Sequence, residues 1–136
     1  MRILIDTSFV VALVNNKDED HEKAIRLSIE VDGKPTLITD AVLLEIGNAL
    51  SRRYKLECIE AIEGFLASFD VEIVRLDETL FDKAFELYKT QTDKTYGLVD
   101  CISFVVMREH GITDALTHDR HFVQAGFRAL MREPIN

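Results

Sequence analysis

The 136-residue chain has little of several features that mark special classes of protein. It holds two cysteines, Cys58 and Cys101, whose spacing matches neither a CxxC motif nor a disulfide-rich framework. Glycine (6 residues) and proline (2 residues) are too scarce for a collagen-like or disordered chain. No apolar run approaches the ~18 residues that span a bilayer, and the first residues do not resemble a secretory signal. We therefore expect a globular protein of the reducing cytoplasm that does not enter a membrane.

An excess of positive charge is also absent, because 16 basic residues stand against 24 acidic ones and the formal net charge is −8. Any contact with nucleic acid must then come from a local basic patch or from bound cations. The sequence lacks the GxxxxGK[ST] and GxGxxG nucleotide-binding motifs, and no serine lies in a GxSxG elbow. The remaining composition, 47% hydrophobic, is that of a folded protein, and we expect residues 1–136 to form a single domain.

Short β-rich runs alternate with longer helical ones along the chain, which predicts an α/β fold with a central parallel sheet. The expected strands cover residues 2–5, 36–39, 71–76, 115–117 and, near the end, 127–131. The expected helices cover residues 9–14, 20–31, 40–54, 57–69, 77–90 and 98–110. The last helix is apolar on nearly every side, so we expect it to be buried.

Four acidic residues have positions that suggest more than a solvated surface: Asp6, Glu45, Asp100 and Asp119. Asp6 and Asp119 each follow an expected strand, and ligands bind at the carboxyl ends of parallel strands. Glu45 lies among apolar residues with no basic residue three or four positions away. Asp100 opens the most hydrophobic helix. Each acid also has an ordinary explanation. Asp6 could cap a helix, and Asp119 could be a turn residue. Glu45 could lie on a solvent-exposed face, and Asp100 could be a favourable charge at a helix N-terminus.

Together, the two strand ends and the two flanking helices predict that the four carboxylates converge. Carboxylates that lie close together repel one another, and a divalent cation removes that repulsion. Oxygen ligands select Mg²⁺ or Mn²⁺ over softer metals. The chemistry expected of such a site is the attack of a metal-activated water on a phosphodiester, with one or two ions taking part.

Nearby polar side chains are expected to support this site. Thr117 lies two positions before Asp119, so on a strand both should face one side, where the Thr117 hydroxyl could orient a carboxylate or a water. The alternative is an ordinary β-branched strand residue. Asn48 lies one helical turn after Glu45 and could form a hydrogen bond with it.

Basic side chains offer weaker candidates for contact with phosphates. The densest basic cluster consists of Arg52, Arg53 and Lys55. Its cations are explained equally well by the favourable position of positive charge at a helix C-terminus. His118, Arg120 and His121 flank Asp119, and we expect them to be rim contacts or exposed residues. A histidine general base is not expected, because a metal-activated water does not require one.

Four segments resemble, in order, the motifs of the PIN domain family of metal-dependent ribonucleases: 3–13, 44–50, 98–102 and 117–122. The resemblance implies a three-layer α/β/α Rossmann-like fold, dependence on Mg²⁺ or Mn²⁺, endonucleolytic cleavage of RNA and, often, a homodimer. The size is similar to that of free-standing VapC-like toxins, which implies a cognate antitoxin protein.

The acidic positions of the family match Asp6, Glu45, Asp100 and Asp119, while Thr7 or Ser8 and Thr117 match its hydroxyl positions. Weak RNA contacts would fall on Arg52, Arg53 and Arg120.

Two other functions remain open at this point. A catalytically idle RNA- or partner-binding module could keep the same fold, since a fold alone does not imply activity. Measurement of divalent-ion binding separates this alternative from a nuclease. A phosphoryl-acceptor domain also clusters acids at strand ends, but the sequence has no clear lysine on a late strand.

Overall fold

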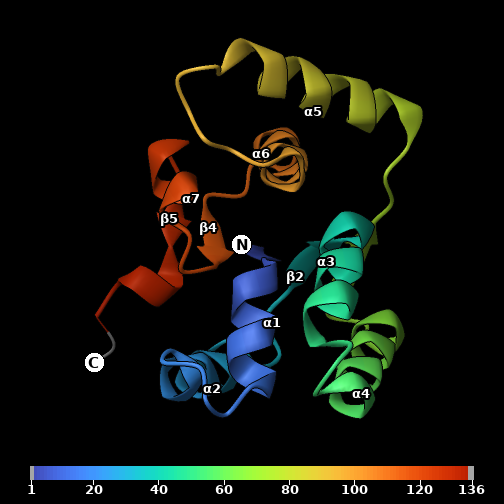
Figure 1. Ribbon diagram of the computed structural model, residues 1–136, viewed down its shortest axis with the longest axis vertical. Helices are drawn as coiled ribbons and strands as arrows, with labels where there is room; N and C mark the ends of the chain where they lie inside the picture. Colours follow the sequence, from blue (N-terminus) through green and yellow to red (C-terminus); the bar gives the residue numbers. More distant parts are fainter. Residues whose placement is uncertain (1, 135–136) are drawn as a thin grey trace.

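The computed structural model describes residues 2–134, and Figure 1 shows their arrangement. Five parallel strands form one sheet in the order β3-β2-β1-β4-β5. The strands are β1 (Ile3–Ile5), β2 (Thr36–Thr39), β3 (Val71–Val74), β4 (Asp114–Leu116) and β5 (Arg128–Ala129). The chain builds the sheet outward from β1 in one direction and then returns to add β4 and β5 on the other side. Strand order therefore reverses between β1 and β4, and this switch point is where α/β sheets place their ligands.

Helices cover both faces of the sheet. The helices are α1 (Thr7–Val14), α2 (His21–Glu30), α3 (Asp40–Leu50), α4 (Lys55–Ala67), α5 (Glu78–Thr90), α6 (Leu98–His110) and α7 (Arg120–Gln124). One core cluster packs α1 to α4 against Ile3 and Ile5, and the other packs α5, α6 and α7 against Leu4 and Leu37. Successive side chains of a strand point to opposite faces, which produces this division. Figure 1 shows the two groups of helices on opposite sides of the strands. The expected three-layer α/β/α fold is confirmed.

Local sequence accounts for several helix boundaries. The Thr39 hydroxyl accepts a hydrogen bond from the Val42 amide, and Asp77 caps α5 in the same way through the Leu80 amide. Helix α6 ends at Gly111, whose φ of 66° lies in the left-handed region that favours glycine. As expected, α6 is largely buried, with Phe104 and Met107 fully enclosed.

Other boundaries differ from the sequence prediction. Helix α1 begins at Thr7 rather than residue 9, so Thr7 and Ser8 lie inside the helix instead of capping it. The helix expected over 40–54 ends at Leu50; residues 51–53 form a turn, and Tyr54 becomes the N-cap of α4. Strand β3 ends at Val74, and the expected strand at 127–131 is two residues long before a 3₁₀ turn (Leu130–Arg132). Helix α7 was not expected, since five residues give little periodic signal.

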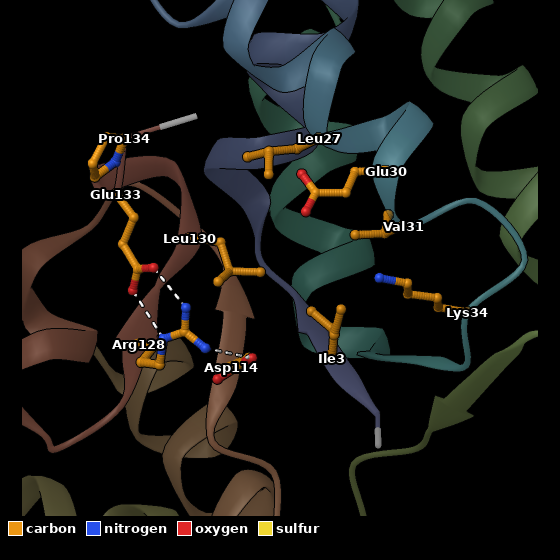
Figure 2. A pocket seen from close by; sticks show the side chains of 10 residues that line it. All are labelled: Ile3, Leu27, Glu30, Val31, Lys34, Asp114, Arg128, Leu130, Glu133 and Pro134. Atoms are coloured by element: carbon orange, nitrogen blue, oxygen red, sulfur yellow. Dashed lines mark hydrogen bonds and ion pairs between the residues drawn. The ribbon is translucent and has the colours of Figure 1, made fainter. Parts of the chain in front are cut away.

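The amino ends of the strands surround a hollow of about 440 Å³, shown in Figure 2. Arg128 lies beside it and forms salt bridges with Asp114 (3.2 Å) and Glu133 (2.6 Å). Asp114 and Glu133, two of the acids that line this hollow, are therefore neutralised by an arginine of the same chain. No helix within residues 2–134 is both long and apolar enough to cross a membrane.

Candidate active site

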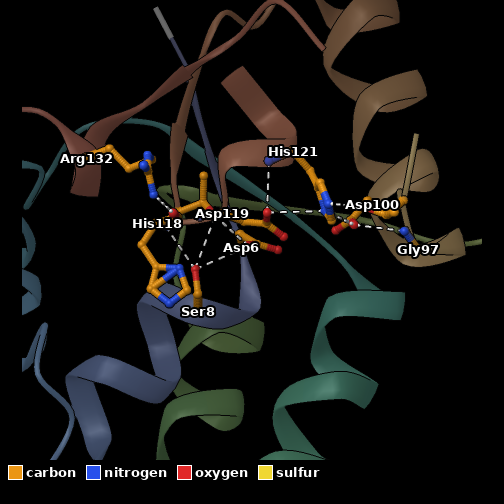
Figure 3. A network of polar contacts seen from close by, with 10 residues as sticks. Asp6, Ser8, Gly97, Asp100, His118, Asp119, His121 and Arg132 are labelled. Carbon is orange, nitrogen blue, oxygen red and sulfur yellow. Dashed lines mark hydrogen bonds and ion pairs between the residues drawn. The ribbon is translucent and has the colours of Figure 1, made fainter. Parts of the chain in front are cut away.

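Acidic side chains from four segments gather at the carboxyl end of the sheet, across the switch point. Asp6 directly follows β1, and Asp119 follows the neighbouring strand β4. The Asp6 amide donates to the Leu116 carbonyl (3.1 Å), which joins the two strand ends. Glu45 comes from α3 and Asp100 from the first turn of α6. Figure 3 shows Asp6, Asp100 and Asp119 facing a common region.

Asp6 occupies the N-cap position of α1, but its carboxylate makes no capping hydrogen bond. Only 6% of the residue is exposed, and its Oδ2 accepts hydrogen bonds from the hydroxyls of Thr117 (2.7 Å) and Ser8 (3.3 Å). Helix capping therefore does not explain this acid.

Burial is the main reason that the pKa of Asp6 rises from 3.8 to about 6. The Thr117 hydroxyl and the Thr7 amide oppose the rise, while the negative charges of Asp100 and Glu45 add to it. The fold thus keeps a carboxylate in a place that disfavours its charge. A cation bound nearby would remove this penalty.

Two hydroxyls connect Asp6 to the loop that carries Asp119. The Thr117 hydroxyl donates to Asp6 and accepts from the Asp119 amide (3.0 Å). The Ser8 hydroxyl lies 3.1 Å from that of Thr117 and accepts from the His118 amide (3.2 Å). Thr117 therefore orients a carboxylate, as the sequence suggested, and the carboxylate is that of Asp6.

Glu45 is exposed, so the expectation of apolar surroundings is wrong. Its apolar neighbours Val42 and Ile46 point into the core, whereas Leu44, 72% exposed, and Glu45 lie on the outer side of α3. Glu45 Oε1 instead accepts a hydrogen bond from the Thr7 hydroxyl (2.6 Å), one residue from Asp6. Asn48 is also exposed, and within residues 2–134 no hydrogen bond joins it to Glu45.

Asp100 and Asp119 meet around a histidine. Asp100 Oδ2 accepts from the Gly97 amide (3.0 Å) at the start of α6, and Asp119 Oδ1 accepts from the His121 amide (2.9 Å) at the start of α7. The Nδ1 atom of His121 lies 3.3 Å from each of these carboxylate oxygens. One atom from each of these three residues lies within 4.8 Å of the others, so the carboxylates of Asp100 and Asp119 are close enough to share a metal ion. Asp6 and Glu45 are not part of this group.

The surroundings of Asp100 also disfavour its charge. Burial raises its pKa and the nearby charge of Asp119 adds to the rise, while Gly97 and His121 oppose it.

The contacts of His121 determine which ring nitrogen carries hydrogen. Nδ1 faces two carboxylate oxygens, which only accept, so Nδ1 is a donor. Nε2 lies 2.8 Å from the Thr95 hydroxyl, which can donate to it. From the sequence, His121 was expected to be a rim contact or an exposed residue, because its position beside Asp119 gave no sign that α6 would bring Asp100 to the same ring.

All four carboxylates share one pattern. In each, one oxygen is held by a donor of the protein: Asp6 Oδ2, Glu45 Oε1, Asp100 Oδ2 and Asp119 Oδ1. The second oxygen receives no hydrogen bond from any side chain of residues 2–134. No lysine or arginine of the described residues forms a salt bridge with any of the four. Each carboxylate is oriented and keeps one oxygen for a cation, which is how metal ligands are commonly supported.

The basic candidates lie in two different places. Arg52 and Arg53 are exposed in the turn that follows α3. Arg120 is exposed beside Asp119, where both border a second hollow.

Comparisons with known proteins show which family this chain resembles. The chain is 34% identical over 127 residues to the 23S rRNA-specific endonuclease VapC20 of Mycobacterium tuberculosis, covering 92% of this chain and 95% of the relative. It is 30% identical over 113 residues to a VapC ribonuclease of Archaeoglobus fulgidus, covering 80% and 72% of the two chains.

The structure matches the crystal structure of M. tuberculosis VapC20, a sarcin–ricin loop cleaving toxin, with a TM-score of 0.83 and 32% identity. The match covers 92% of this chain and 95% of that one. The family model for the PIN domain matches residues 3–128, so the phosphoryl-acceptor alternative no longer applies. The chain belongs to the PIN domain family.

Proposed function

We propose that this protein is a VapC-type endoribonuclease that hydrolyses RNA phosphodiester bonds with Mg²⁺ or Mn²⁺ held by Asp6, Glu45, Asp100 and Asp119. The observation that carries the proposal is the convergence of four oriented carboxylates at the switch point, with no lysine or arginine of residues 2–134 bridged to them. VapC20 and the Archaeoglobus protein, which cover most of this chain, are named as an endonuclease and a ribonuclease.

The four carboxylates fit a hard divalent cation, because each of them offers an oxygen ligand. No lysine or arginine of residues 2–134 forms a salt bridge with them. When bound, the ion supplies Lewis-acid polarisation of the phosphodiester and a lower pKa for the attacking water.

The protein's own residues orient the carboxylates by holding one oxygen of each. Thr117 and Ser8 fix Asp6, and the Thr7 hydroxyl fixes Glu45. His121 Nδ1 donates toward Asp100 and Asp119, so this nitrogen cannot accept a proton from water in the same orientation. His121 is therefore a positioning residue and not a general base.

The relatives also suggest the biological setting. We propose that the protein is the toxin of a type II toxin–antitoxin pair, inhibited by a cognate antitoxin protein. We further propose that it forms a homodimer and acts in the cytoplasm. The names of the VapC relatives and the size of the chain support this extension.

An RNA cleavage assay tests the proposal directly. The substrate named for VapC20 makes a sarcin–ricin loop RNA the first to use, beside total RNA. Purified protein should cleave RNA in Mg²⁺ or Mn²⁺, lose activity in EDTA and regain it when the ion is restored. Calorimetry with Mn²⁺ should detect binding to the wild type and weaker binding to Asp119→Asn. Binding of RNA without cleavage under every cation condition would instead support the catalytically idle module.

A further inference from the structure

A groove of about 690 Å³ opens from the acidic site at Asp119. Its walls come from three separate segments: the start of α2, the segment after β4 and the 3₁₀ turn near the end of the chain. Its volume lies within the range of about 300–1,000 Å³ found for small-ligand sites. Asp119 belongs to the acidic site and also lines the groove, so the groove adjoins the site.

Three lysine or arginine side chains line this groove: Lys23, Arg120 and Arg132. None of them forms a salt bridge with a carboxylate of residues 2–134. Arg132 Nη1 donates to the His118 carbonyl (3.0 Å), and no side-chain hydrogen bond of Arg120 is found within the same residues. The charges of these residues therefore remain available to an anionic ligand, in a protein whose net charge is −8.

Besides Asp119, two further acids keep the groove from being a purely anion-binding surface, so three acids stand beside its three lysine or arginine side chains. Glu19 and Asp20 also line it, and Asp20 lies 4.0 Å from His118 Nε2. Such a mixture suits a ligand that combines negative charge with hydrogen-bond donors. A ribonucleotide unit has both, because its phosphate is anionic and its 2′-hydroxyl and base amino groups donate.

We propose that this groove binds the ribonucleotide next to the scissile phosphate, with Lys23, Arg120 and Arg132 contacting the RNA backbone. The inference rests on the proposed function and adds the path of the RNA strand. It places the strand along the α2 and 3₁₀ side of the site. Arg52 and Arg53, at the end of α3, lie outside this path.

Salt-dependent binding of a fluorescent single-stranded RNA tests the path. The measurement uses Asp6→Asn protein in Mg²⁺, so that binding is recorded without cleavage. Arg120→Ala and Lys23→Ala, added singly, should each weaken binding and reduce the slope of log affinity against log salt by about 0.7. Lys34→Ala, at the opposite end of the sheet, is the matched control and should leave the slope unchanged.

Steady-state cleavage by proteins with Asp6 intact gives a second readout. Arg120→Ala should raise KM with little change in kcat, since Arg120 binds the strand and does not act on the reacting phosphate. Arg120→Lys keeps the charge and should recover most of the loss.

Equal effects of Arg120→Ala and Lys34→Ala, or no effect of either groove variant, would overturn the path. Failure of the proposed function looks different: RNA would bind and remain uncleaved, while the groove variants would still weaken binding.

Discussion

The acidic residues at the two ends of the sheet differ in their charge partners and in the direction of their pKa shifts. At the amino end, Asp114 and Glu133 are paired with Arg128, and this contact lowers the pKa of Glu133 (Figure 2). At the carboxyl end, Asp6 and Asp100 have only hydroxyl, amide and imidazole partners, and burial raises the pKa of both (Figure 3).

The difference shows where the molecule needs an external charge. The negative charge of a carboxylate paired with arginine is already balanced within the folded chain. Carboxylates that are buried together without a lysine or arginine destabilise the fold until a cation or protons neutralise them. The acids at the amino end thus form structural ion pairs, whereas those at the carboxyl end have the properties of a cation-binding site.

The largest expected effect comes from Asp6→Asn, which should act in opposite directions on activity and stability. Loss of a ligand oxygen should lower cleavage by about 10²-fold or more. In EDTA at pH 7, the same change should raise the free energy of unfolding by up to about 3 kcal/mol, because it removes a carboxylate whose pKa the fold raises from 3.8 to about 6. Cleavage assays and urea unfolding check the two effects. A variant that is both active and less stable would contradict the role of Asp6.

Substitution of His121 should have the next largest effect, through the metal site. His121→Ala removes the donor at Nδ1 and should weaken Mn²⁺ binding by about 10- to 100-fold. His121→Asn places an amide nitrogen near the Nδ1 position and should recover much of that affinity. His121→Gln, whose amide reaches the Nε2 position, should not. Calorimetry gives the affinities, and equal binding by the Asn and Gln variants would show that the Nδ1 contact is unimportant.

The pH dependence of stability sharpens the contrast between the two ends. For Asp6, the folded pKa of about 6 lies above the unfolded value of 3.8, so the folded state binds this proton more tightly. The resulting penalty is present above pH 6 and disappears as the pH falls toward 4. Between pH 7 and pH 5 the wild type in EDTA should gain about 1 kcal/mol relative to Asp6→Asn. Saturating Mg²⁺ should shrink or reverse this gain, and urea unfolding at each pH measures it.

The smallest effect is expected at the amino end. Arg128→Ala breaks contacts made by an exposed arginine side chain with Asp114 and Glu133, and such contacts contribute little and are screened by salt. Stability should fall slightly at low salt and less at high salt, with no change in Mn²⁺ affinity or cleavage. Thermal unfolding at two salt concentrations provides the check. Loss of cleavage in this variant would mean that the two ends of the sheet are coupled.

Sequence patterns were sufficient for most of the fold and for part of the candidate site. Alternating β-rich and helical runs predicted the parallel sheet, and the strand-end positions of Asp6 and Asp119 followed from it. These features depend on local periodicity, which is visible along the chain. The short helix α7 and the early end of α3 at Leu50 were missed, because the first gives little periodic signal and periodicity locates the ends of helices poorly.

The remaining parts of the site could not be predicted because they depend on distant contacts. Glu45 was expected among apolar neighbours, yet it is exposed and held by Thr7. Nothing near His121 in the sequence indicates that its ring lies between Asp100 and Asp119.

The sequence by itself determined the fold class, the order of its elements and the presence of acids at two neighbouring strand ends. Only the tertiary structure decided which oxygen of each carboxylate is held by the protein, which donor holds it and which cations border the site. The physical reason is that helix and strand periodicity is local. Hydrogen bonds such as that from Thr117 to Asp6, 111 residues apart, depend on where the whole chain packs.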